Sequence, residues 1–214
     1  MLAQADAAAL SALARGLEGL DTDCYARHGR DPAQPLLGLG PPSARLCFVG
    51  RDPGEREIAQ WRPFVGASGR QIRALLPPGA EDEVFWINTV PYKPRGNKAW
   101  PAGVRRAFHA VLFPLLLRQW QGADVLTFGS EAFHWFGLAQ PEALRRELAA
   151  FWARPDRFSS SLPLVFEGEG QRRTLVLHPL PHPSPANAQW KLRFPQLLQS
   201  RLQQLLAVAP GPGP

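Results

Sequence analysis

The chain has 214 residues, of which 45% are hydrophobic, enough for a single domain with a sizeable core. Positive side chains exceed negative ones by six, which favours a polyanionic partner such as nucleic acid, although a basic protein without such a partner would carry the same charge. Because no run of about 18 apolar residues occurs and the N-terminus lacks a basic start before an apolar stretch, we expect a soluble, cytoplasmic monomer with no membrane contact.

The N-terminal segment predicts one amphipathic helix followed by a connector. Leucines recur at three- and four-residue spacings within residues 2–20, which is typical of a helix with one apolar face. Proline and glycine then dominate residues 29–43. We interpret residues 1–40 as this helix and its connector within one domain spanning 1–207, and we expect the Pro-Gly tail, 208–214, to be disordered.

From residue 46 onward, short apolar runs alternate with longer helical patterns. The runs predict strands because each ends at a turn-forming Gly or Pro or at a His-Pro pair; they are residues 46–49, 84–90, 125–128 and 174–177. The periodic patterns predict helices at about 68–76, 102–120, 130–137, 141–153 and 190–207. This alternation predicts an α/β fold with a largely parallel sheet.

Three polar residues lie at or just past the carboxyl ends of predicted strands. They are Asp52, Asn88 and His182. Open parallel sheets place their ligand crevice at this edge, so we expect the three side chains to point into one cleft.

Cysteine and histidine spacing argues against a metal site. Cys24 and Cys47 lack a metal-ligand spacing, and we expect them to be buried free thiols in a reducing compartment. His178 and His182 are four residues apart, but the prolines between and after them prevent the helix that would place both imidazoles on one face. We therefore predict no metal and no cofactor.

Four short segments carry a resemblance to a known family. They are Gly50-Arg51-Asp52-Pro53-Gly54-Glu55-Arg56-Glu57, Pro63-Phe64-Val65-Gly66-Ala67-Ser68-Gly69, Asn88 at the end of a strand, and His182-Pro183-Ser184-Pro185. In this order they resemble the uracil-DNA glycosylase superfamily over roughly residues 45–195. The resemblance implies a three-layer α/β/α fold around a four-stranded, mostly parallel sheet, and an enzyme that hydrolyses the N-glycosidic bond of a flipped-out base in DNA.

The resemblance also implies roles for the residues of the pocket. Asp52 corresponds to the acid that holds the attacking water and faces the developing sugar cation, and His182 to the histidine that hydrogen-bonds uracil O2 as the base leaves. Phe64 corresponds to the aromatic floor under the base, and Asn88 to the amide that reads uracil O4 and N3–H. The remaining predicted substrate-binding residues are Gly50, Arg51, Pro53, Gly54 and Glu57.

Each of these residues also has a purely structural interpretation. An Asp-Pro-Gly sequence forms turns, an asparagine caps them, and a phenylalanine fills a core. It is the combination and order of the segments that favour the functional interpretation.

Phosphate contacts are predicted in three places. Ser68 lies in a small-residue loop opening a helix, and Ser184 in the loop after His182. The turn-rich segment 91–98 concentrates positive charge. The predicted DNA-binding residues are Ser68, Lys93, Arg95, Lys98, Ser184, Asn187, Lys191 and Arg193. A solvated loop and a solvated basic face are the alternatives for 91–98 and for the last two residues.

The sequence departs from its relatives at several positions. The uracil-specific branch has a tyrosine where this chain has Gly54, and Gly54 to Glu57 instead resembles the Gly-x-x-Glu of an iron–sulfur branch, whose glutamate stands near C5 of the base. That branch holds its cluster with four cysteines, which this chain lacks, and usually has alanine at the position of Asp52. The loop 184–189 lacks the bulky leucine that fills the gap left by a flipped base, so single strands or mismatches are favoured as substrates.

These observations predict a monofunctional DNA glycosylase that removes uracil and, having no lysine in the matched motifs, leaves an abasic site without Schiff-base strand cleavage. Its partner is DNA containing a damaged or deaminated base. Three alternatives stay open: a glycosylase for hypoxanthine, xanthine or mismatched pyrimidines; a catalytically idle nucleic-acid binding module; and an unrelated α/β enzyme acting on a phosphorylated small molecule.

Overall fold

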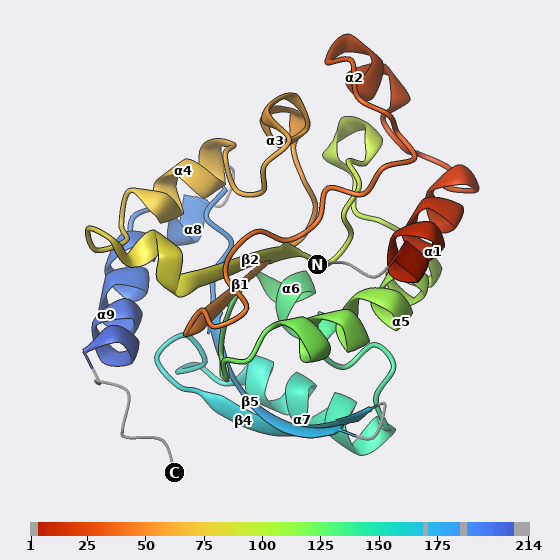
Figure 1. The fold of residues 1–214 in the computed structure, drawn as a ribbon. Coiled ribbons are helices and arrows are strands. Elements are labelled where there is room, and N and C mark those ends of the chain that lie inside the picture. Colours follow the sequence, from red (N-terminus) through yellow and green to blue (C-terminus); the bar gives the residue numbers. More distant parts are fainter. Residues whose placement is uncertain (1–3, 169–170, 185–187, 208–214) are drawn as a thin grey trace.

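A computed structural model describes residues 4–168, 171–184 and 188–207 (Figure 1). The predicted disordered tail and Asn187 lie outside these residues. Five strands form one sheet: β1 (Leu46–Gly50), β2 (Val84–Asn88), β3 (Asp124–Phe128), β4 (Leu162–Gly168) and β5 (Gln171–Leu180). The α-helices are α1 (Gln4–Arg15), α2 (Thr22–Arg27), α3 (Glu55–Gln60), α4 (Ala67–Arg73), α5 (Ala102–Gln119), α6 (Ser130–Trp135), α7 (Glu142–Ala153), α8 (Ala188–Lys191) and α9 (Phe194–Leu206), and two short 3-10 turns are η1 (Ala80–Glu83) and η2 (Arg95–Asn97).

The sheet order is β2-β1-β3-β5-β4, and every pair is parallel except β4 with β5. The mostly parallel sheet is confirmed, but the prediction of four strands was wrong. The missed strand, β4, contains Pro163 and buries only alternate side chains, because it lies at an edge where proline is tolerated. A mixed pattern of this kind gives no continuous apolar run for sequence analysis to detect.

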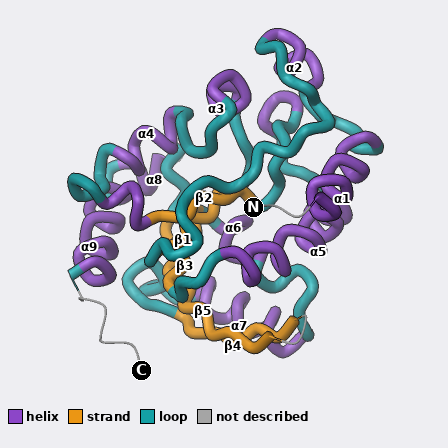
Figure 2. Tube along the Cα trace, viewed as in Figure 1, coloured by secondary structure: helices purple, strands orange, loops and turns teal. Residues whose placement is uncertain are grey.

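Helices cover both faces of the sheet, giving three layers (Figures 1 and 2). Leu46 and Phe48 point to one face, where they join a core cluster with side chains from α4 and α9. Cys47 and Val49 point to the opposite face and pack in the cluster that includes α1, α5, α6 and α7. Because strand side chains alternate, a strand buried on both faces reads as an uninterrupted apolar run, which is why β1 was predicted correctly.

Several helix boundaries differ from the predictions. The N-terminal helix ends at Arg15, and the short helices α2 and α3 were not predicted because six residues are too few to show a periodicity. The last predicted helix is divided into α8 and α9 by a turn at Leu192 and Arg193. Within the described ranges, no helix is both long enough and apolar enough to span a membrane.

The parallel strands end at one edge of the sheet. The register pairs Gly50 with Asn88 and Phe128 with Leu180, so all four carboxyl ends lie side by side. Residues that follow β1, β3 and β5 therefore meet residues at the end of β2. This arrangement places the polar residues predicted at strand ends next to one another.

Candidate active site

A cleft of about 640 Å³ opens at this edge of the sheet. We call it the strand-end cleft. It brings together most of the predicted site: Gly50, Arg51, Asp52, Pro53, Gly54, Glu57, Phe64, Ser68, Asn88, His182 and Ser184 all line it. Its other lining residues include Glu55, Arg56, Pro94, Asn97 and Phe128, which sequence reasoning had not assigned to the pocket.

The Asp52 carboxylate lies deep in the wall of the cleft. Its side chain is only 4% exposed, and Arg51 Nε donates to Asp52 Oδ2 over 2.6 Å. Burial raises the pKa of Asp52 to about 7, although the Arg51 charge and hydrogen bond oppose this shift. A carboxyl group with this pKa changes its charge near neutral pH, a property common among acids and bases of active sites.

The loop that carries Asp52 is fixed by the neighbouring strand. Thr89 donates twice, from its backbone N–H to Gly50 O over 2.9 Å and from Oγ1 to Arg51 O over 2.7 Å. The backbone N–H of Val90 donates to the same Arg51 oxygen over 3.2 Å. Asp52 therefore extends from a backbone held against the end of β2.

Phe64 packs at the bottom of the cleft. Its ring centroid lies 5.1 Å from Trp86 and 6.1 Å from Phe128, so an aromatic cluster supports it from below. Its backbone is left-handed, with a φ of 57°, a conformation that non-glycine residues seldom adopt and that often occurs at functional sites. Arg73 of α4 holds this loop by donating from Nε to Phe64 O over 2.9 Å.

Asn88 stands beside Phe64 at the end of β2 and is 6% exposed. No hydrogen bond to its side-chain amide occurs within the described part of the chain. Gly50, its partner across the strand pair, makes room for both side chains: a Cβ there would lie 2.7 Å from Phe64 Cζ and 2.8 Å from Asn88 Oδ1. The amide thus lines the cleft with donor and acceptor available to a ligand.

Glu57 ties together the two loops that border the cleft. Its carboxylate accepts hydrogen bonds from the backbone N–H of Gly54 over 3.1 Å and of Gly66 over 2.6 Å. Both loops approach it so closely that a Cβ at Gly54 or Gly66 would lie 2.9 Å from the nearest carboxylate oxygen. Glu57 lines the cleft as predicted, but both of its oxygens already bind backbone amides.

His182 faces the cleft from the loop after β5. The backbone N–H of Ser184 donates to Nδ1 over 3.1 Å, so in the neutral imidazole the proton is on Nε2. Burial and the nearby Arg51 charge both lower the pKa of His182, which favours this neutral form. Its ring packs close to Gly129, where a Cβ would lie 3.1 Å from His182 Cβ.

Two charged residues near Asp52 were not predicted. Glu131 lies in the first turn of α6 with its Oε2 3.5 Å from Arg51 Nε, and Arg105 Nη1 of α5 lies 3.9 Å from Glu131 Oε1. The signal for Glu131 was present, because it follows the end of β3 by three residues, as Asp52 follows β1 by two. An acid in the first turn of a helix has an ordinary explanation in the helix dipole, so its position alone did not distinguish it.

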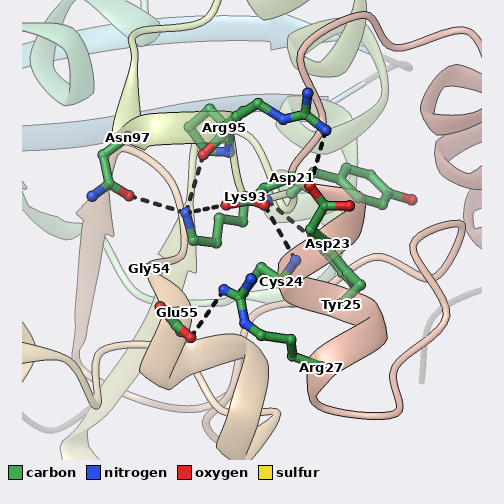
Figure 3. A network of polar contacts seen from close by, with 12 residues as sticks. Asp21, Asp23, Cys24, Tyr25, Arg27, Gly54, Glu55, Lys93, Arg95 and Asn97 are labelled. Atoms are coloured by element: carbon green, nitrogen blue, oxygen red, sulfur yellow. Dashed lines mark hydrogen bonds and ion pairs between the residues drawn. The ribbon is translucent and has the colours of Figure 1, made fainter.

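The predicted phosphate contact at Lys93 is corrected by the structure (Figure 3). Its ammonium is buried and pairs with Asp21 Oδ2 over 2.9 Å, with further hydrogen bonds to Pro94 O and Asn97 Oδ1. The reason is the N-terminal segment, which covers this loop: the backbone N–H of Asp21 also donates to Lys93 O over 3.1 Å. Lys93 therefore does not present its charge to solvent.

The other predicted phosphate contacts differ in position. Ser68 and Ser184 line the strand-end cleft, and Lys98 and Arg193 are exposed. Arg95 is also exposed, 3.4 Å from Asp23 Oδ2. Lys191 ends α8, and its side chain lies outside the described atoms.

Both cysteines are buried and free, as predicted. Cys47 lies within β1, in the core, and Cys24 lies on α2, so this chain does not fit the four-cysteine cluster of the iron–sulfur branch. His178 forms hydrogen bonds with Asp124 Oδ1 and Ser161 Oγ, each over 2.8 Å. Among the described residues, Cys24, His28 and Glu55 form one group with potential ligand atoms within 4.8 Å of one another, and Glu55 there accepts hydrogen bonds from Arg27 and His28.

Comparison with known proteins agrees with this geometry. The uracil DNA glycosylase superfamily matches residues 37–206. A type-4 uracil-DNA glycosylase of Sulfurisphaera tokodaii is 42% identical over 64 residues, covering 28% of this chain and 29% of the relative. Those of Thermotoga maritima and Saccharolobus solfataricus are 35% and 38% identical over 65 residues, covering 29% and 28% of this chain and 34% and 30% of the relatives. The matches to these relatives are local, whereas the family match covers most of the chain, including all four strand ends: this protein belongs to the uracil DNA glycosylase superfamily.

Proposed function

We propose that the protein is a monofunctional DNA glycosylase that hydrolyses the N-glycosidic bond of uracil in DNA and leaves an abasic site. The observation that carries this proposal is the composition of the strand-end cleft. A buried carboxyl group, an available amide and a neutral imidazole come from three different strand ends and line one cleft with Phe64. The names of the type-4 relatives support the same activity.

Recognition of the base depends on Phe64 and Asn88. A base that has left the duplex stacks on the Phe64 ring, because every base has an aromatic face. The Asn88 amide then donates to O4 and accepts from N3–H, the adjacent acceptor and donor of uracil. Cytosine reverses these two groups and leaves the amide mispaired, at a cost of about 1–3 kcal/mol for each buried unpaired group.

Bond cleavage separates charge, and two residues stabilise the separated charges. The Asp52 carboxylate faces the sugar, where it holds the attacking water and stabilises the developing cation. His182 donates from Nε2–H to O2 of the base as negative charge develops there. A neutral imidazole suits this role because its donor stays in place while the charge appears.

We expect the reaction to end at the abasic site, because no lysine is among the described residues that line the cleft. Lys93 is the nearest lysine in sequence to the matched motifs, and its ammonium is buried in contact with Asp21. Water, held by Asp52, is therefore the nucleophile, and the strand is not cleaved through a Schiff base. We also propose that the enzyme is a cytoplasmic monomer that acts on DNA, in keeping with its composition and positive charge.

A specific observation favours a second substrate class. Gly54 has no side chain to meet a methyl group at C5, and both oxygens of Glu57 are bound to loop amides. Thymine in mismatches and the larger base hypoxanthine are therefore candidates alongside uracil. A panel of oligonucleotides carrying each base separates the two alternatives, and release of hypoxanthine alone would exclude uracil as the substrate.

The first test is release of uracil from a labelled single-stranded oligonucleotide, followed by alkali to cleave the abasic site. We expect release by the natural chain, and a loss on the order of 100-fold in Asp52→Ala and His182→Ala. His134→Ala is the matched control, because His134 is on α6 and does not line the strand-end cleft. Binding without release of any base in the panel would show an idle binding module instead.

A further inference from the structure

Arg51 is held between acidic and backbone groups on three sides. Its Nε lies 2.6 Å from Asp52 Oδ2 and 3.5 Å from Glu131 Oε2, and its Nη2 donates to Asn97 O over 2.9 Å. Arg105 approaches the far oxygen of Glu131. Charges therefore alternate along a short series from Asp52 through Arg51 and Glu131 to Arg105, which we call the charge series.

We propose that Arg51 is the positioning residue for Asp52, holding Oδ2 against the wall of the cleft so that Oδ1 faces the reacting sugar, and that Glu131 weakens this hold. This inference rests on the proposed function, and it assigns Arg51 a part in the chemistry rather than in contact with the base.

The geometry favours this role because one Asp52 oxygen is already occupied. Arg51 Nε binds Oδ2, and no hydrogen bond to Oδ1 occurs within the described residues. Since the side chain is almost fully buried, rotation of the carboxylate away from Arg51 would leave a desolvated charge without a partner. The ion pair therefore selects both the orientation of the carboxylate and its ionised form.

Glu131 opposes the ionisation of Asp52 in two ways. Its carboxylate shares the Arg51 guanidinium with Asp52, and its own negative charge disfavours a second anion nearby. Arg105 partly neutralises Glu131 from the side of α5. Burial and the Arg51 charge lower the pKa of His182, so its imidazole adds no charge to this series. Burial raises the pKa of Asp52, and the charges of the series then change how readily it ionises.

The contacts of Arg51 distinguish this role from phosphate binding. Its Nε and Nη2 already donate to Asp52 and Asn97, and its side chain is 32% exposed. Exposed Arg56, which also lines the cleft, is better placed to meet a DNA backbone. Loss of a phosphate contact weakens DNA binding, whereas loss of a positioning residue slows the bond cleavage of bound DNA.

The test is the pH dependence of the single-turnover rate for three variants. In Arg51→Met we expect a rate about fivefold lower at pH 7 that recovers toward alkaline pH, because an apparent pKa one unit higher lowers the ionised share of the carboxyl from about a half to about a tenth. Glu131→Gln should shift the profile in the opposite direction, to lower pH. Arg51→Lys, which keeps the charge, should lie between Arg51→Met and the natural chain.

Two controls separate this role from its alternatives. Arg56→Met removes a charge from the same cleft and should change DNA affinity without shifting the profile. If Arg51→Met weakens DNA binding but leaves the pH profile in place, Arg51 is a phosphate contact and the inference is wrong. A damaged fold would lower the rate equally at all pH values, which thermal unfolding of each variant would reveal.

A second readout does not depend on catalysis. Titration of protein with ¹³C-labelled aspartate carboxyl groups, with Asp52→Asn to assign the signal, follows the ionisation of Asp52 directly. We expect its midpoint to rise in Arg51→Met and to fall in Glu131→Gln, even if the protein releases no base. Midpoints unchanged in both variants would overturn the inference and leave the proposed function to be judged by base release alone.

Discussion

Gly50, at the end of β1, makes room for the Phe64 ring and the Asn88 side chain. The absence of a Cβ lets the Phe64 ring and the Asn88 amide occupy adjacent positions above the strand end. Close approach, rather than backbone conformation, explains glycine at this position.

Replacing Gly50 by alanine should therefore displace the pocket without unfolding the protein. The new methyl group would lie 2.7 Å from Phe64 Cζ, so the ring or the strand must move. A displacement of this size in a reacting complex lowers the rate by on the order of 100-fold. Gly103→Ala is the control, because a Cβ there meets nothing within 4 Å. Full activity of Gly50→Ala in the uracil-release assay would show that this spacing is not needed.

The positions of some site residues could be predicted from the sequence, and those of others could not. Asp52, Asn88 and His182 could be predicted to lie together because the rule for strand ends requires only their order along the chain. Burial of Lys93 could not be predicted, since it depends on Asp21, far earlier in the sequence. The pairing of Glu131 with Arg51 could not be predicted either, because it depends on how α6 packs beside the loop after β1.

Among the elements, α2 and its N-cap residue hold the loop 91–98, which borders the cleft. Asp21, the N-cap of α2, pairs with Lys93, and Tyr25 of the same helix accepts a hydrogen bond from the Lys93 backbone N–H over 3.1 Å. Pro94 and Asn97 of this loop line the cleft. The N-terminal segment thus supports one wall of the candidate active site (Figure 3).

Lys93→Met should destabilise the fold while leaving DNA affinity nearly unchanged. Removing one partner of a buried ion pair costs about 3 kcal/mol, at the lower end of the usual range because Asp21 keeps some access to water. Urea unfolding measures this loss, and Asp21→Asn in the same chain should restore part of it because asparagine still caps α2. Unchanged stability with weaker, less salt-dependent DNA binding would restore Lys93 as a phosphate contact.

The elements that the sequence missed are those stabilised by tertiary contacts. Strand β4 pairs only with β5 and carries a proline, and α2 and α3 are each six residues long. Helices of this length do not form on their own propensity, so their formation depends on the surfaces against which they pack. In contrast, the long helices show a helical periodicity of apolar residues, and the strands buried on both faces show continuous apolar runs. Both patterns extend over enough residues to predict the element.

At the scale of the whole molecule, one buried histidine links stability to pH. His109 of α5 lies between Phe113, at 4.9 Å between ring centroids, and Trp135, at 5.0 Å. Neither ring nitrogen has a hydrogen-bond partner among the described residues. Burial lowers the pKa of His109 from 6.5 to about 4.

We therefore expect the contribution of His109 to stability to fall as the pH is lowered from about 6.5 toward 4, and we measure it as the difference between the natural chain and His109→Phe. In this window the unfolded chain takes up a proton at His109 that the folded protein does not accept, so acid favours unfolding by up to roughly 3 kcal/mol. His109→Phe should remove this share of the pH dependence and gain stability over the natural chain at pH 5. At pH 7.5 the histidine is neutral in both states, and the comparison reports packing alone. Parallel pH curves for the two proteins would contradict the prediction.

The carboxylate of Glu57 bridges two loops that border the cleft, so this residue can change the size of the cleft without changing the residues proposed to break the bond. Because one carboxylate accepts hydrogen bonds from the amides of Gly54 and Gly66, shortening the side chain to aspartate would draw both loops toward the backbone of α3 by about one carbon–carbon bond, roughly 1.5 Å. Asp52, Asn88 and His182 belong to other contacts and would stay where they are. The preference for a small or a large base can therefore change, during evolution or by design, at a position that takes no part in breaking the bond. The ratio of uracil release to hypoxanthine release by Glu57→Asp would measure that change.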